Sequence, residues 1–279
     1  MKCVCIICGG GFYPFLIAQE CIRRKINFCL IFLNGFYRSD YDWPKVDSIA
    51  VNLGEVGVAL KFLKKNNVDT IILAGNVSRP QFSNLSLDSV GAKWLAKLGM
   101  SAFLGDDALL KSISNLLQEE GLTVVSGTDF LEDVFLENKI YTKRIPSVDE
   151  WNDIKIGFIK AKKLGERDIG QAIVIKNGEV IKEEDEKGTE QLINLSFNLK
   201  KNSDGGVLVK VSKPQQDLRI DLPTIGVDTI YQLHKNKFSG VAVESGKCIV
   251  LNKDEVIAQA NTYNLFLVGC DLNFLEKQK

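Results

Sequence analysis

Histidine is nearly absent from this sequence, which has a single example, His234, among its 279 residues. His234 lies between Leu233 and Lys235 in a run that predicts a helix, and we expect it to be exposed. A mechanism with histidine as general base therefore has one weak candidate. The sequence also lacks a G-x-S-x-G motif, a P-loop and a zinc-protease motif, so any catalysis is expected to use carboxylates and a metal ion.

The sequence has no net charge either, since 35 Lys and Arg residues balance 35 Asp and Glu residues. No overall field draws the chain to nucleic acid, which is not an expected partner, so phosphate recognition must come from a local arrangement. No apolar run reaches the roughly 18 residues that span a bilayer. The apolar start at 1–8 runs into three glycines without a cleavage site, which predicts a buried strand. We expect a soluble cytoplasmic protein.

Paired cysteine motifs are missing as well. The seven cysteines are odd in number and include no C-x-x-C pair, and several lie within apolar runs. Cys3 and Cys5 would share one strand face with no histidine nearby, which is a poor metal site. We expect the cysteines to be small core residues in a reducing compartment.

The first half of the chain alternates strand-like and helix-like runs. Strands are expected at 2–8, 27–33, 46–53, 68–74 and 122–125, with helices at 15–25, 56–65, 87–98 and 107–120. Buried strands separated by amphipathic helices predict an α/β fold with a doubly wound, mainly parallel, Rossmann-like sheet. We assign this domain to residues 1–134.

The second half is a separate α/β domain in our interpretation. Charged and turn-forming residues at about 135–146 predict a linker, and a helical run near 148–164 opens a domain at 147–279. Lys176-Asn177-Gly178 lies between two apolar runs, and Asn-Gly in that position predicts a hairpin. Strands of mixed order are expected, with a topology that the sequence leaves open.

Three glycines, Gly9 to Gly11, follow the first strand and precede a helix, where backbone N–H groups receive phosphate. Pro14 stands at the third glycine position of G-x-G-x-x-G, and the second strand ends at Asn34 without an acid for a ribose. A dinucleotide site is therefore disfavoured. The alternatives are an anion or nucleotide site, which we favour, and a tight turn in which Pro14 starts the helix.

A second polar loop, Gly75 to Pro80, lies at the carboxyl end of a buried strand, where doubly wound folds bind ligands. Gly75 permits close approach to the backbone, Asn76 can donate and accept hydrogen bonds, and Arg79 can fork onto a phosphate. The residue types fit equally well a solvated Asn/Ser/Pro turn without a ligand.

The segment from Lys213 to Gly226 is the most informative in the second half. A strand there would place Asp217, Arg219 and Asp221 on one face, about 7 Å apart in succession. Such a row could hold Mg²⁺, orient water and neutralise charge at a pyrophosphate. The alternative is a self-paired, solvated edge strand that ends at Pro223. The acidic run at 183–190 is expected to be mostly solvated surface, with Thr189 capping a helix.

Several of these segments, in this order, resemble the UDP-2,3-diacylglucosamine pyrophosphatase family of the LpxI type over nearly the whole chain. The resemblance is carried by GGGFYP at 9–14, LAGNVSRPQF at 73–82, GDDALL at 105–110, RDIGQAIVIKNG at 167–178 and KPQQDLRIDLPTIGVDTI at 213–230. It departs at 187–190, where the chain has Lys-Gly-Thr-Glu and the family usually has Glu-Gly-Thr-Asp. A metal role for that segment is therefore not assigned.

The resemblance implies an Mg²⁺-dependent hydrolase of lipid A biosynthesis, with water attacking the α-phosphorus. Its products would be UMP and 2,3-diacylglucosamine 1-phosphate (lipid X), the latter held between the domains. The resemblance places the catalytic acid on Asp221 and substrate contacts on Gly11, Phe12, Gly75, Asn76, Gln171, Thr189 and Lys213. Residue chemistry adds contacts at Gly10, Arg79, Arg219 and Thr224, and metal ligation at Asp217 and Asp221.

Two other functions remain open at this point. One is a Rossmann-type oxidoreductase, which retained NAD or FAD would favour. The other is a noncatalytic nucleotide-sugar or lipid carrier, which would bind the substrate without forming UMP. The amphipathic substrate is compatible with transient contact at the inner membrane surface, and the oligomeric state is left open, with a homodimer among the alternatives.

Overall fold

The computed structural model describes residues 3–78, 80–82, 85–99, 101, 105–200 and 204–278. The chain forms two compact units. The first comprises Met1–Glu132 together with Asp217–Asp221, and the second comprises Asp133–Gln216 and Leu222–Lys279. A short segment of the second half of the sequence, the one that carries Asp221, therefore belongs to the first unit.

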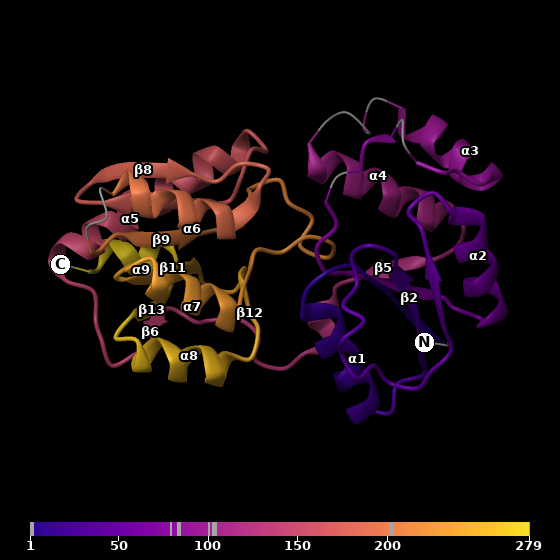
Figure 1. Ribbon diagram of the computed structural model, residues 1–279, viewed down its shortest axis with the longest axis horizontal. Coiled ribbons are helices and arrows are strands. Elements are labelled where there is room, and N and C mark those ends of the chain that lie inside the picture. The colour runs from indigo at the N-terminus through magenta and orange to yellow at the C-terminus, as the bar shows by residue number, and fades with distance from the viewer. Residues whose placement is uncertain are drawn as a thin grey trace. The chain divides into compact units, whose positions relative to one another are not determined.

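The first unit, which contains the N-terminus marked in Figure 1, has a five-stranded parallel sheet with the order β3-β2-β1-β4-β5. Its strands are β1 (Val4–Cys8), β2 (Phe28–Leu33), β3 (Ser48–Val51), β4 (Thr70–Ala74) and β5 (Thr123–Val125). Its helices are α1 (Tyr13–Arg23), α2 (Val56–Lys65), α3 (Ser89–Leu98) and α4 (Asp106–Glu119), with the 3₁₀ turn η3 (Gly127–Phe130) after β5. The predicted doubly wound parallel sheet is confirmed, and the strand order reverses between β1 and β4.

Both faces of this sheet are covered, which explains why its strands are apolar throughout. Alternate β1 residues, such as Val4 and Ile6, pack with Ile17 and Ala18 of α1. The opposite face packs against α2 and α4, and Leu63 and Leu117 belong to that cluster. All seven cysteines are buried and unpaired, four of them on β1 and β2 or next to them, as expected of core residues.

The second unit contains a mixed six-stranded sheet with the order β6-β13-β11-β9-β7-β8. Its strands are β6 (Lys139–Ile140), β7 (Ala172–Lys176), β8 (Glu179–Glu183), β9 (Val207–Lys210), β11 (Gly240–Glu244) and β13 (Phe266–Cys270). β9, β11 and β13 are parallel, whereas β6, β7 and β8 pair antiparallel to their neighbours. β10 (Thr224–Ile225) and β12 (Ile249–Val250) form a separate two-stranded pair. The predicted second α/β domain with a mixed sheet is confirmed.

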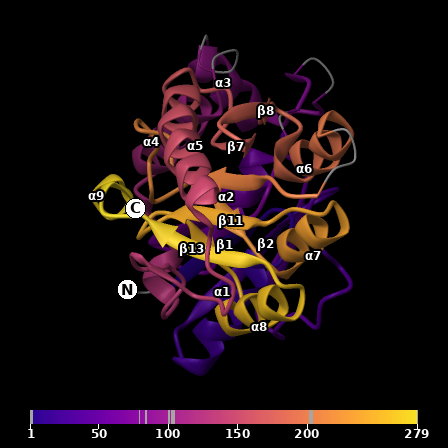
Figure 2. The same cartoon turned by 90° about the vertical axis from the view of Figure 1, so that its left-hand side faces the viewer.

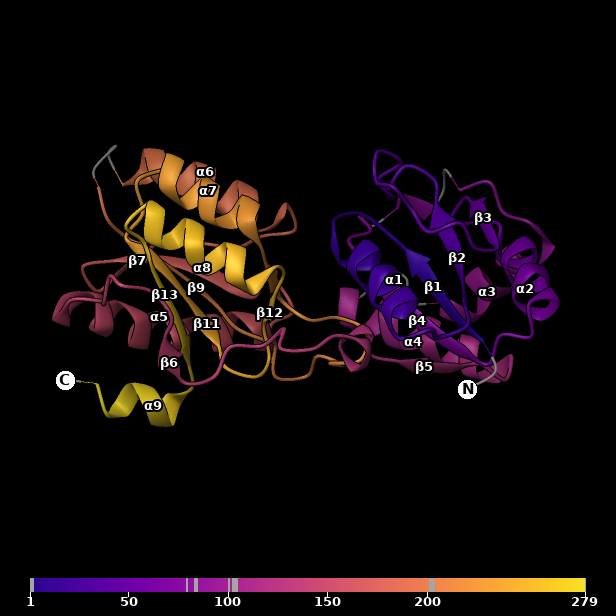
Figure 3. The same ribbon diagram turned by 90° about the horizontal axis from the view of Figure 1, so that it is seen from below.

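Helices cover both faces of this second sheet. They are α5 (Val148–Glu166), α6 (Gly188–Leu199), α7 (Val227–Lys235), α8 (Lys253–Thr262) and α9 (Leu272–Glu276). One core contains residues of α6, α7 and α8, and the other contains residues of α5 and α9. Figure 2 shows α6, α7 and α8 on one side of the strands and α5 and α9 on the other, and Figure 3 shows the same division from below.

Two local predictions about the second unit meet different outcomes. The hairpin at Asn177-Gly178 is confirmed: both residues have positive φ, and Asp153 accepts their backbone N–H groups at 2.9 and 2.6 Å. The expected linker at about 135–146 instead contains β6, which pairs with β13. A strand of two residues is too short to give a periodic pattern in the sequence. The linker was predicted because the residues around β6 are charged or turn-forming.

No helix in the part of the chain that the structure describes is long and apolar enough to cross a membrane.

Candidate active site

The glycine-rich turn and the loop after β4 lie together at the carboxyl edge of the first sheet. Gly10 and Asn76 pair like two antiparallel residues: the Gly10 N–H donates to Asn76 O at 2.8 Å, and the Asn76 N–H donates to Gly10 O at 2.9 Å. β1 and β4 are the neighbours between which the strand order reverses. The two loops predicted as ligand sites therefore form one structure at the position where doubly wound sheets bind ligands.

Glycine is required at two points of this contact. Gly75 has φ +89°, and a Cβ atom there would lie 2.4 Å from Gly10 O and 2.8 Å from the Pro14 ring. A Cβ atom at Gly9 would lie 2.8 Å from Asn76 O. Gly11, by contrast, has φ +86° with no atom within 4 Å of its Cβ position, so its backbone is open to a ligand.

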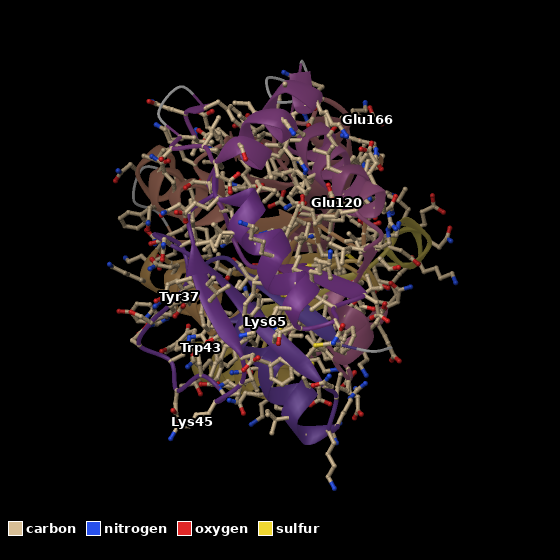
Figure 4. The ribbon with its side chains drawn as sticks, turned by 90° about the vertical axis from the view of Figure 1, so that its right-hand side faces the viewer. Tyr37, Trp43, Lys45, Lys65, Glu120 and Glu166 are labelled. Atoms are coloured by element: carbon tan, nitrogen blue, oxygen red, sulfur yellow. The ribbon has the colours of Figure 1, made fainter. Side chains whose placement is uncertain are left out.

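Phe12 lies at the edge of an aromatic group formed by α1 and the segment after β2. Its ring centroid is 5.6 Å from that of Phe15 and 5.7 Å from that of Tyr41. The ring centroid of Trp43 is 5.4 Å from that of Phe15. Phe32 contacts both Trp43, at 4.9 Å, and Tyr37, at 4.7 Å, and the last two residues are labelled in Figure 4. These rings are only partly buried. Phe12 thus both packs on its neighbours and keeps exposed surface beside the glycine turn.

The segment from Asp217 to Asp221 is a turn, so the predicted strand is wrong. The N–H groups of Ile220 and Asp221 both donate to Asp217 O, at 2.9 and 3.1 Å, and the Arg219 N–H donates to the Asp217 carboxylate at 3.1 Å. The side chains of a turn do not alternate between two faces as those of a strand do, so the evenly spaced row expected from Asp217, Arg219 and Asp221 does not form. An Asp side chain that accepts the N–H two residues on stabilises a turn against a strand.

This turn rests on the same edge of the first sheet as the glycine loops. Ser126, directly after β5, lies with its hydroxyl 3.5 Å from Leu218 O. Ile220 packs against the core cluster that contains Leu117 and Val124. Because the carboxyl ends of parallel strands meet at one edge, the contact of Leu218 with Ser126 brings the turn to the edge that also carries Gly10 and Asn76. The side chain of Asp221 is partly buried.

Arg219 binds Asp217 with two nitrogen atoms. Its Nε donates to Oδ1 at 3.0 Å and its Nη2 donates to Oδ2 at 2.6 Å. These hydrogen bonds lower the pKa of Asp217 below its usual value. Both carboxylate oxygens are therefore engaged, which fits the self-paired alternative and leaves Asp217 poorly placed as a metal ligand.

Three expected substrate contacts of the second unit lie at one edge of its sheet. Gln171 precedes β7 and its carbonyl accepts the N–H of Val211, which follows β9. Thr189 is in the first turn of α6, and Thr224 is in β10. Two charged side chains that the sequence did not single out, Glu184 and Lys210, bring these three residues together.

Sequence reasoning missed these two charges for different reasons. Glu184 stands in the acidic run expected to be solvated surface, yet it is only 6% exposed. Lys210 ends the apolar strand β9, where a lysine looks like an exposed strand terminus. Thr189 does not cap its helix, since the N-cap position of α6 belongs to Lys187. Their common partner, the Thr189 hydroxyl, is evident only in the folded structure, where β9 pairs with β7.

Lys213 is held by an ion pair at this edge. Its Nζ lies 2.6 Å from Asp168 Oδ1, and the residue is 8% exposed. Next to it, Lys162 donates to Glu244 at 2.6 Å and to Ser212 O at 2.8 Å. Burial lowers the pKa of Lys162. Burial alone would raise the pKa of Glu244, but hydrogen bonds from Lys162 and Ser212 bring it below its usual value.

Two further sequence expectations concern Arg79 and His234. Arg79 lies outside the described residues. His234 is exposed and stacks on Tyr263 with 4.0 Å between ring centroids, so it offers no general base at either edge. Among the described residues, no group of three or more His, Cys, Asp and Glu side chains is arranged to hold a metal ion.

Comparison with known proteins places both halves of the chain in one family. The model of the LpxI N-terminal domain matches residues 3–134, and that of the LpxI C-terminal domain matches residues 137–268. The chain is 34% identical over 278 residues to the UDP-2,3-diacylglucosamine pyrophosphatase LpxI of Caulobacter vibrioides, covering 97% of this chain and 98% of that protein. The crystal structure of the L-amino acid ligase from Bacillus licheniformis matches with a TM-score of 0.22 at 14% identity, over 72% of this chain and 42% of the ligase, and supports no argument.

Proposed function

Because the chain belongs to the LpxI family of UDP-2,3-diacylglucosamine pyrophosphatases, we propose that it hydrolyses the pyrophosphate bond of UDP-2,3-diacylglucosamine in lipid A biosynthesis. The products would be UMP and 2,3-diacylglucosamine 1-phosphate, formed by attack of water on the α-phosphorus. The observation that carries the proposal is the match over both halves of the chain at 34% identity. The paired glycine loops support it, because they offer backbone N–H groups and a helix start to a phosphate.

Asp221 is the proposed catalytic residue. It is partly buried and belongs to the turn that contacts Ser126 through Leu218 O, and a carboxylate can orient water or accept its proton. We propose substrate contacts by Gly10, Gly11, Phe12, Gly75, Asn76 and Arg79, and by Gln171, Thr189, Lys213, Arg219 and Thr224. Arg219 and Lys213 would supply positive charge to the phosphates, in exchange for their present carboxylate partners.

We also propose that the reaction requires Mg²⁺. Mg²⁺ binds through one or two carboxylates together with waters and substrate phosphates. Asp221 is the proposed carboxylate of such a site. Asp217 has both oxygens bound to Arg219 and would join the site only if Arg219 moved to the phosphates. Bound metal would neutralise charge on the phosphates.

Two other functions are less well supported. An oxidoreductase would need a dinucleotide site, but Pro14 occupies the third glycine position of that motif. The Pro14 ring also lies close to the loop after β4, since a Cβ atom at Gly75 would come within 2.8 Å of it. Flavin or nicotinamide retained on purification would support that alternative. A noncatalytic carrier would bind the substrate and release no UMP.

The direct test is incubation of the purified chain with UDP-2,3-diacylglucosamine and Mg²⁺ in H₂¹⁸O. We expect release of UMP that carries the heavy oxygen, since attack at the α-phosphorus places the water oxygen on UMP. Excess EDTA should abolish release, and added Mg²⁺ should restore it. Heavy oxygen in the lipid product instead would contradict attack at the α-phosphorus, and undiminished activity in EDTA would contradict the metal requirement.

We propose a cytoplasmic location with transient contact at the inner membrane surface, because the substrate carries two acyl chains that partition into a bilayer. Flotation with vesicles that contain the substrate should recover more of the chain than flotation with plain vesicles of the same phospholipids. Equal recovery would contradict substrate-dependent contact.

A further inference from the structure

Two buried charged residues, Glu184 and Lys210, connect three of the residues proposed to bind substrate. Each is 6% exposed. The Glu184 carboxylate accepts the Gln171 N–H at 2.8 Å through Oε2 and the Thr189 hydroxyl at 2.6 Å through Oε1. The Lys210 ammonium donates to Thr189 Oγ1 at 2.9 Å and to Thr224 O at 3.0 Å. One network thus fixes residues from three separate elements.

The direction of each hydrogen bond at Thr189 follows from its partners. An ionised carboxylate only accepts and an ammonium only donates, whereas a hydroxyl has one donor and two acceptor sites. The Thr189 proton must therefore point to Glu184, and one of its lone pairs receives a proton from Lys210. The hydroxyl has one lone pair left and no proton to give. It can accept a hydrogen bond from a ligand, but it cannot donate one to a phosphate oxygen.

This arrangement is costly to bury. The free energy lost when a carboxylate and an ammonium leave water is offset only when both groups make good hydrogen bonds. A protein with a well-packed apolar pair in their place would often be at least as stable. The benefit of this network is geometric, since it sets one hydroxyl in one orientation. The same carboxylate accepts the backbone N–H of Gln171, which is another of the proposed substrate contacts.

We propose that Glu184 and Lys210 are positioning residues that hold the Thr189 hydroxyl as a hydrogen-bond acceptor for an N–H or O–H group of the substrate. This inference rests on the proposed function. It places the sugar, its amide or the nucleoside at Thr189, because phosphate oxygens have no proton to donate at this position.

A double-mutant cycle on kcat/KM for UMP release tests the proposal. Lys210→Met keeps the apolar stem and Thr189→Val keeps the side-chain shape, and each should lower kcat/KM by about ten- to a hundredfold, the cost of an unmet buried hydrogen bond. If Lys210 acts through the hydroxyl, the double variant should lose no more than the worse single variant. Thr189→Ser should retain most activity. Additive losses in the double variant would overturn the proposal.

Lys200→Met is the matched control, because it makes the same change at a buried lysine of the same unit. Lys200 is 4% exposed, and its ammonium donates to Gly205 O at 2.6 Å and Asn236 O at 3.1 Å, near the opposite end of β9. This variant should unfold at a lower temperature and keep the wild-type kcat/KM. A loss of kcat/KM equal to that of Lys210→Met would show general destabilisation and would count against the positioning role.

A measurement without turnover separates this proposal from the proposed function. The side-chain ammonium signal of Lys210 in NMR spectra of the full chain should shift or broaden in Thr189→Val and in Glu184→Gln. An unchanged signal in both variants would refute the network even in an active enzyme. A wild-type chain that releases no UMP while showing these NMR changes would refute the proposed function and leave the acceptor geometry of Thr189 standing.

Discussion

Asp221→Ala should reduce UMP release by at least about a thousandfold, with little effect on the folded state. Removal of a positioned acid–base or charge-stabilising group typically costs two to four orders of magnitude in rate. Alanine keeps the backbone N–H bond from residue 221 to Asp217 O at 3.1 Å, which holds the turn. The loss should appear in kcat, and a melting temperature within a few degrees of wild type would show that the folded state is kept.

Asp254→Asn is a suitable control for charge, because Asp254 is exposed in the first turn of α8. It should keep wild-type kcat and KM. Asp217→Asn tests the metal assignment separately: the Arg219 pair would be weakened, but Mg²⁺ dependence should stay nearly the same if Asp221 is the ligand. If Asp221→Ala keeps activity within tenfold of wild type, Asp221 is not the catalytic residue. If Asp217→Asn needs a much higher Mg²⁺ concentration than wild type, Asp217 is a metal ligand.

The first unit was predictable because its physics is local and repeated. Apolar runs of strand length, each followed by an amphipathic helix, specify a parallel sheet with both faces covered. Once the sheet is parallel, the loops after β1 and β4 must emerge at the same edge, so the pairing of Gly10 with Asn76 follows from topology. The sequence alone could not show that Asn76 reaches back to Gly10 through its backbone and not its side chain.

The second half of the sequence was less predictable, and the two main failures lie there. Alternation of charged and apolar residues from Asp217 to Asp221 fits a strand, but it fits equally well a turn in which Asp217 accepts local N–H groups. In the same way, an acidic run does not reveal which of its members is buried. Glu184 is buried because the antiparallel β7–β8 pair brings it to the start of β7, where the Gln171 N–H needs an acceptor. The turn is a local competition that alternation alone cannot decide, whereas the burial of Glu184 depends on partners distant in sequence.

Gly75→Ala should destabilise the first unit by about 3 kcal/mol or more, which is among the largest effects that a single methyl group can have. Two costs combine: a positive φ of +89° strains any L-residue, and the new Cβ atom would lie 2.4 Å from Gly10 O, a backbone atom that cannot move without breaking its bond to the Asn76 N–H. Gly35→Ala separates these costs, because Gly35 has φ +82° with no atom within 4 Å of its Cβ position. We expect Gly35→Ala to lower the free energy of unfolding by only about 1–2 kcal/mol.

Chemical denaturation monitored by the fluorescence of Trp43 and Trp94, both in this unit, measures the two variants side by side. Equal losses would mean that Gly75 is needed for its φ alone and that the loops after β1 and β4 can separate without cost.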